Sequence, residues 1–198
     1  MALGHVPSNA GPTAAAEQAA AAASVTPPAP PPGQSPRTLT AADLRATLRR
    51  FRGTQLLLPS IVQLAPDAAA VLLEHDAMHL SLGGLKTLTP EVAAILARRG
   101  GSLSFDSLEQ IDAATARALS AHSGWLALDG LKSISAAVAA MLAKHQHSLS
   151  LRGLRAIPDD VAAQLTTYTG ILRISKAAAL SPAGRETLSR IAGTMHVE

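Results

Sequence analysis

Apolar residues recur along the chain in a compound pattern that repeats about every 23 residues. Each copy opens with two apolar residues separated by one position, which lie on the same face of a short strand because side chains alternate along a strand. The six copies of this pair are Leu56/Leu58, Leu80/Leu82, Leu103/Phe105, Leu126/Leu128, Leu149/Leu151 and Leu172/Ile174. Their spacings of 24, 23, 23, 23 and 23 residues predict six copies of one structural unit.

Two further apolar anchors follow each strand, and a helix start follows them. The third anchors are Ile61, Leu85, Leu108, Leu131, Leu154 and Ala177, and the fourth anchors are Leu64, Leu88, Ile111, Ile134, Ile157 and Leu180. A side-chain oxygen then stands where it can cap a helix N-terminus, at Thr89, Asp112, Ser135 and Ser181. Pro90 and Pro182 fit the first helical position, so each unit is predicted to be a strand, a turn and a short helix.

One such unit buries too little apolar surface to offset the entropy of ordering it, so we expect the units to stack. Stacking aligns the strands in a parallel sheet on one face and the helices on the other. We assign residues 54–192 to the repeats, residues 38–53 to an N-terminal capping helix and residues 193–198 to a tail. The last strand, around Arg173, would then be an open edge through which two copies of the chain could associate, and Arg173 would discourage that pairing.

The chain resembles leucine-rich-repeat proteins, in particular short bacterial arrays of the form Leu-x-Leu-x-Gly-Leu-x-x-Leu-(Ser/Thr)-Pro-Glu, over residues 55–192. The resemblance implies an α/β leucine-rich-repeat-like solenoid of six repeats with a helical N-terminal cap. It also implies a non-enzymatic module that binds proteins, often through the sheet. The chain departs from the commonest pattern because it has no asparagine in the repeats, where the family usually forms an asparagine ladder.

The N-terminal residues 1–37 differ in composition from the repeats. They are first Ala-rich and then Pro-rich, with too few large apolar side chains to form a core, which indicates a disordered arm that acts as a spacer or tether. They have no basic residue before Arg37 and no leucine-rich segment, so no secretory signal or membrane span is evident, and a cytoplasmic location is slightly favoured. The chain has no cysteine, which excludes disulfides and thiolate sites.

Charge is concentrated at the N-terminal end. The chain has a net charge of +3, and five arginines against Glu17 and Asp43 place all of it in the first 53 residues. Because the repeats are neutral overall, they lack the broad basic face that binding to a phosphate backbone requires. Arg45, Arg49 and Arg52 follow one side of the capping helix, and attachment of this helix to a membrane surface or nucleic acid is the alternative function.

Candidate partner-binding residues occupy the strand positions that face away from the leucines. These candidates are Ser81, Ser104, Asp106, Asp129, Ser150, Arg152 and Arg173. The set has an acidic centre at Asp106 and Asp129 and a basic end at Arg152 and Arg173. Without a cleft or an acid partner, the two carboxylates do not predict catalysis.

One further column of polar residues occupies the same position in successive units. It consists of His75, Arg99, His122, His145 and Tyr168, each placed near a helix C-terminus, where the helix dipole favours cations. A metal or pH-sensing role for the histidines is the alternative explanation. No phosphate loop, nucleophile elbow or dinucleotide motif is present. We therefore expect a protein-interaction or scaffold module, an accessory subunit without a metal or cofactor.

Overall fold

The computed structural model describes residues 40–49, 51, 53–191 and 193–197, so the predicted arm and Arg52 lie outside the described residues. Within this part, helices alternate with the strands of one seven-stranded, all-parallel sheet. The helices are α1 (Ala41–Leu48), α2 (Pro66–Leu73), α3 (Pro90–Ala97), α4 (Ala113–Ser120), α5 (Ala136–Leu142), α6 (Asp159–Leu165) and α7 (Pro182–Leu188). The strands are β1 (Gln55–Leu57), β2 (His79–Ser81), β3 (Ser102–Ser104), β4 (Leu126–Ala127), β5 (Ser148–Leu151), β6 (Ile171–Ile174) and β7 (Thr194–Val197).

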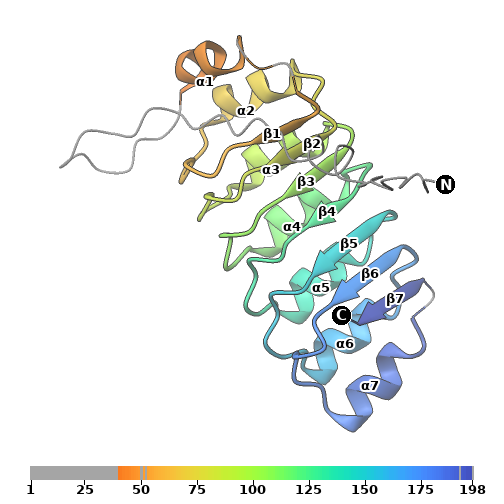
Figure 1. Ribbon diagram of the computed structural model, residues 1–198. Helices are drawn as coiled ribbons and strands as arrows, with labels where there is room; N and C mark the ends of the chain where they lie inside the picture. The colour runs from red at the N-terminus through yellow and green to blue at the C-terminus, as the bar shows by residue number, and fades with distance from the viewer. Residues whose placement is uncertain (1–39, 50, 52, 192, 198) are drawn as a thin grey trace, which may run out of the picture.

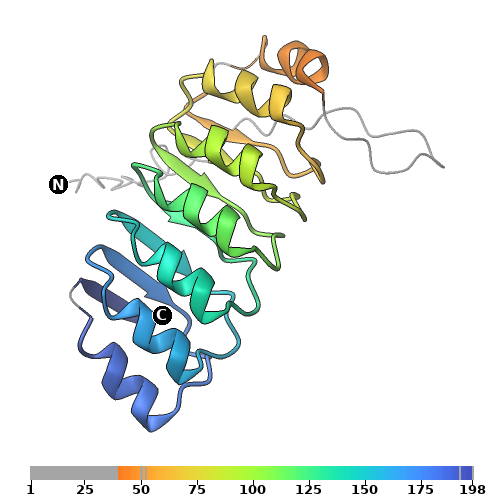
Figure 2. The same ribbon diagram turned by 180° about the vertical axis from the view of Figure 1, so that it is seen from behind.

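The strands lie side by side in chain order, and the helices cover one face of the sheet (Figures 1 and 2). The register confirms the predicted repeat, because Leu56 pairs with Leu80, Leu80 with Leu103 and so on through Leu172. Every member of the six predicted apolar pairs is at most 1% exposed. The architecture is therefore a repeat-like α/β stack in which each unit contributes one layer of the core.

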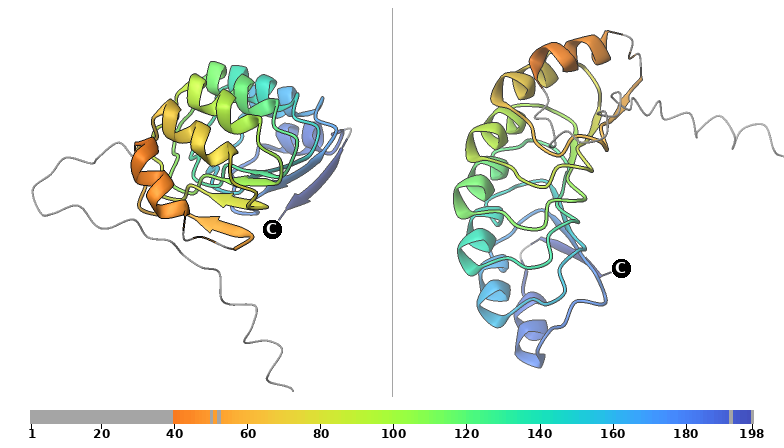
Figure 3. Two further views of the ribbon diagram at one scale, coloured as in Figure 1. Left: turned by 90° about the horizontal axis from the view of Figure 1, so that it is seen from above. Right: turned by 90° about the vertical axis from the view of Figure 1, so that its left-hand side faces the viewer.

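The stack is curved, with the helices along its outer side and the strands along its inner side (Figure 3). Parallel strands lie about 4.8 Å apart, whereas packed helices need about 8 to 10 Å between their axes. Because each unit contributes one strand and one helix, successive units must lie further apart on the helix side than on the strand side. A column of fully buried alanines lets neighbouring helices approach closely and so limits the curvature: Ala69, Ala93, Ala116, Ala139 and Ala162.

The helix starts follow the predicted capping chemistry. The side chains of Thr89, Asp112, Ser135 and Ser181 each accept a hydrogen bond from the backbone N–H three residues later. Helix α1 begins with a capping box between Thr40 and Asp43. Its Leu44, Leu48 and the following Phe51 are buried, and α1 packs against α2, so this helix covers the first layer of the stack.

The prediction that β6 forms the open edge of the sheet is wrong. Strand β7 pairs with β6 in parallel, with Leu172 opposite Met195 and Ile174 opposite Val197, so most of the predicted tail continues the sheet. Met195 and Val197 follow the previous apolar pair by 23 residues and preserve its alternation, a signal that was present in the sequence. Among the described strands, β7 is the edge at this end of the sheet, so association of two copies through the final strand would use β7 rather than Arg173.

The third anchor of the last unit is also displaced from its predicted position. Ala177 is exposed, and Ala178 is the residue that enters the core. The hydrogen bond that closes the turn shifts in the same way, because Ala178 N–H donates to the Ser175 carbonyl. In the preceding unit the bond joins Leu154 to Leu151, so the last turn is offset by one residue.

Candidate interaction face and internal polar column

The inner face of the stack is formed by the strand side chains that point away from the leucines. In the middle of the strands this column consists of Leu57, Ser81, Ser104, Ala127, Ser150, Arg173 and His196. Ser81, Ser104 and Arg173 are half-buried, whereas Ala127 and Ser150 are buried. The prediction that Ser150 faces solvent is therefore wrong, because the residue is fully buried.

Asp129 and Arg152, which face this side from adjacent units, form an ion pair with each other. The Arg152 Nε and Nη2 atoms lie 3.1 and 3.0 Å from Asp129 Oδ2, and the Arg152 backbone N–H donates to Oδ1 at 2.9 Å. Ser150 Oγ donates to the same Oδ1 at 2.6 Å. One residue of the expected acidic centre and one of the expected basic end are thus paired, and the pair joins two units.

Asp106 lies on the unit before Asp129 and is exposed to solvent. Partial desolvation of its carboxylate and the neighbouring Asp129 carboxylate raise the pKa of Asp106, and Arg152 opposes that increase. A cavity of about 330 Å³ beside it is lined by Lys86, Asp106, Ser107, Glu109, Gly130 and Lys132. Charges of both signs line this cavity, with Lys86 and Lys132 against Asp106 and Glu109.

Two apolar residues on the inner face were missed as candidates. Trp125 and Ile171 are 37% and 39% exposed and point away from the core, because each stands one residue before a buried leucine. Trp125 comes directly before β4 and Ile171 begins β6, and Ser148, which pairs with Ile171 and precedes the partner of Leu126, lies between them. The signal was in the sequence, since the alternation that buries Leu126 and Leu172 places their predecessors on the opposite face.

The column of polar residues after the helices is internal. Arg99 is 5% exposed, and its guanidinium donates to the carbonyls of Leu72 and His75 at 2.6 and 2.7 Å and to that of Ala77. Tyr168 is buried, and its hydroxyl donates to the carbonyl of His147, one unit earlier. The helix-dipole explanation is therefore insufficient, because these side chains link the backbones of successive units.

His122 and His145 occupy the middle of this column. Their rings are parallel within 1° with centroids 6.3 Å apart, and His122 Nε2 lies 3.1 Å from the Gly101 carbonyl oxygen. Neither ring nitrogen of His145 has a hydrogen-bond partner among the described residues. Burial lowers the pKa of both imidazoles, which favours the neutral ring over the cation that a helix dipole would attract.

The basic helix presents its arginines to solvent while its apolar side is already occupied. Arg45 and Arg49 are exposed, and Arg45 Nη2 lies 3.8 Å from Glu74 Oε1. Leu44 and Leu48 face the core, so α1 has no free apolar side to insert into a membrane surface. Attachment through α1 would have to depend on the arginine charges.

Over residues 40–49, 51, 53–191 and 193–197, no helix has the length and apolarity that crossing a bilayer requires. The same residues contain no group of three or more His, Cys, Asp or Glu side chains placed to hold a metal ion. In the comparisons with known proteins, no family model, no curated protein and no solved structure matches the chain.

Proposed function

We propose that the chain is a leucine-rich-repeat-like solenoid that serves as a non-enzymatic protein-interaction or scaffold module. The parallel unit of 23 residues and the inner sheet face support this assignment. The missing asparagine ladder has a substitute, since Arg99, His122 and Tyr168 contact carbonyls of the preceding unit. Backbone groups between units are thereby satisfied without asparagine.

The observation that carries the proposed function is the apolar pair formed by Trp125 and Ile171 on the inner face. Two strand spacings separate them, about 10 Å, and the small side chain of Ser148 lies between. A partner side chain placed over Ser148 can therefore contact both apolar residues. Trp residues contribute strongly to protein interfaces because they bury a large area at a small entropic cost.

The charged groups around this apolar pair define the partner further. Arg173 lies two residues beyond Ile171 on the same face, is half-buried and is not a free cation, and Asp129 and Arg152 neutralise each other. A protein segment with an exposed apolar side chain complements this surface. The N-terminal arm would tether the module to a larger assembly as an accessory subunit.

Site-specific photocrosslinking tests the proposed face. A benzoylphenylalanine replaces Trp125 in one variant and Ala114, exposed on α4, in a control variant, and both are expressed in the source cells. We expect a discrete crosslinked partner from position 125 and none from position 114. Crosslinks from position 114 alone would place the interaction on the helix side and refute the proposed face.

A loss-of-contact variant complements the crosslinking. Trp125→Ser resembles the serines at the equivalent positions of neighbouring strands, so the fold should be preserved. Copurification of the crosslinked partner should fall by at least about tenfold, as expected for a central aromatic contact. Unchanged copurification, with circular dichroism identical to that of the parent chain, would show that the Trp125 side chain makes no contribution.

A further inference from the structure

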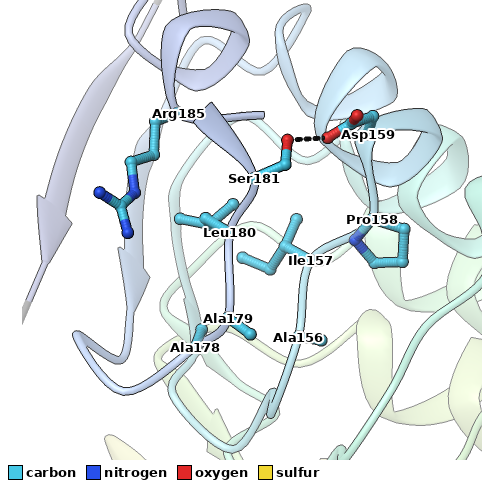
Figure 4. A pocket seen from close by; sticks show the side chains of 9 residues that line it. All are labelled: Ala156, Ile157, Pro158, Asp159, Ala178, Ala179, Leu180, Ser181 and Arg185. Atoms are coloured by element: carbon cyan, nitrogen blue, oxygen red, sulfur yellow. Dashed lines mark hydrogen bonds between the residues drawn. The ribbon is translucent and has the colours of Figure 1, made fainter. Parts of the chain in front are cut away.

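An open hollow of about 640 Å³ lies between the strand-to-helix turns of the last two units (Figure 4). Its lining residues are Ala156, Ile157, Pro158, Asp159, Ala178, Ala179, Leu180, Ser181 and Arg185. We call this feature the alanine hollow. Its volume falls within the range of about 300 to 1,000 Å³ that is usual for ligand sites. The hollow is separate from Trp125 and Ile171 on the inner face.

The alanine hollow exists because the last units depart from the residues that earlier units place at the same positions. Because the last turn is offset by one residue, Ala178 takes the buried position of Leu154, and Ala179 takes the position that Lys86, Lys132 and Arg155 hold in earlier units. Where Ala156 stands, the earlier units carry Gln63, Thr87, Gln110 and Ser133. The stack itself tolerates long polar side chains at the positions of Ala156 and Ala179, so small apolar residues there are not required by the fold.

The backbone around the alanine hollow is already hydrogen-bonded. Ile157 N–H donates to the Ala179 carbonyl at 3.0 Å, and Ala179 N–H donates to the Arg155 carbonyl at 2.8 Å. At the rim, Ser181 Oγ donates to Asp159 Oδ1 at 2.5 Å (Figure 4). A ligand would therefore meet an apolar floor rather than unpaired backbone groups.

Arg185 supplies the one cation among the lining residues. It stands on α7 at the position where α2 to α6 have a buried alanine, and its guanidinium has no hydrogen-bond or ion-pair partner among the described residues. Figure 4 shows Arg185 and Leu180 on the same side of the segment formed by residues 178–180. A guanidinium beside an apolar floor complements a carboxylate attached to an apolar chain.

We propose that the alanine hollow binds the C-terminal end of an extended apolar peptide, with the terminal carboxylate paired to Arg185. The openness of the hollow to solvent favours a peptide over a fatty acid, because a peptide keeps its outward backbone groups in water while an alkyl chain gains most when enclosed. The small side chains of the floor leave room for short apolar residues. This binding is independent of the inner-face interaction.

Nuclear magnetic resonance titration of the ¹⁵N-labelled full chain tests the proposal. The probe is the peptide acetyl-Ala-Leu-Ala-Leu with a free carboxylate, compared with the same peptide as a C-terminal amide. We expect amide shifts confined to the turns around residues 156–159 and 178–185, with the carboxylate form binding about fivefold tighter than the amide. No shifts with either peptide at about 10 mM would overturn the proposal.

Three variants separate recognition from folding. Arg185→Met should remove the preference for the carboxylate, whereas Arg190→Met, which breaks an exposed pair with Glu186 on the same side of the stack, should retain it. Ala179→Gln introduces a long polar side chain at an exposed position, where earlier units also carry long polar residues, and should weaken both peptides. Equal binding of acid and amide by the parent chain, or the same loss in the Arg190 variant, would contradict a specific role for Arg185.

Discussion

Replacing Arg99 tests whether the internal polar column holds successive units together. Arg99→Met keeps much of the apolar stem but removes three hydrogen bonds to the carbonyls of Leu72, His75 and Ala77. Each carbonyl left without a partner costs about 1 to 3 kcal/mol when buried. Two effects offset part of this loss. A buried carbonyl oxygen tolerates the loss of one hydrogen bond better than a buried N–H does. The variant also avoids the cost of burying a charged guanidinium, the same desolvation that lowers the Arg99 pKa.

The net effect expected for Arg99→Met is a decrease of about 2 to 4 kcal/mol in the free energy of unfolding. Arg99→Lys should recover only part of it, because an ammonium cannot reproduce the planar fork that reaches separate carbonyls. The matched control is Arg98→Met at the exposed neighbouring position, for which we expect a change below about 0.5 kcal/mol.

Urea unfolding followed by fluorescence provides the measurement, because Trp125 is the single tryptophan and lies one unit beyond Arg99. The midpoint should move while the slope with urea stays constant, as for a change in stability without a change in exposed surface. If Arg99→Met and Arg98→Met destabilise the chain equally, or if neither does, then the hydrogen bonds of Arg99 do not join the units energetically.

The remaining predictions concern other contacts between units. Burial lowers the pKa of His122 and His145 below the unfolded value of about 6.5, so the unfolded chain binds more protons than the folded chain below that pH. The urea midpoint should therefore be constant above a pH of about 6.5 and fall on acidification. His145→Leu should reduce the fall, and an unchanged pH profile in the variant would argue against buried neutral rings. Tyr168→Phe removes the hydrogen bond to the His147 carbonyl and should cost about 1 to 2 kcal/mol by the same urea assay, with Tyr168→Leu costing more through lost packing. Asp129→Asn should lower the free energy of unfolding by about 1 to 2 kcal/mol. A double-mutant cycle with Arg152→Met should give a coupling energy of about 1 kcal/mol that high salt reduces. A coupling energy of zero would mean that the ion pair does not stabilise the fold.

The layers of the core could be predicted because leucine spacing determines the register directly. A shift of one residue between Leu103 and Leu126 would turn every leucine of a strand toward solvent, so one register alone buries them all. The caps at Asp112 and Ser135 could be predicted for a similar local reason, since a side-chain oxygen and the N–H three residues later are close only in a helix start.

The internal polar column and the interaction face could be predicted only in part. The repeat placed Arg99, His122 and Tyr168 in one column, but chain spacing does not determine whether such a column faces water or the next unit. Ser150 bonds to Asp129, which also pairs with Arg152, and this contact between residues 23 positions apart could not be predicted from spacing alone. The offset of Ala178 was hidden because three consecutive alanines fit either alignment.

The hydrogen bonds that side chains make between units share a direction that bears on how the chain is made. Arg99, His122, Ser150, Arg152, Tyr168 and Ser181 each reach back to the unit before their own. A newly synthesised unit can therefore dock on its predecessor as it leaves the ribosome, without waiting for later sequence. Because α1 already covers the first layer, the growing chain has a template from the outset, and assembly can keep pace with translation in one direction.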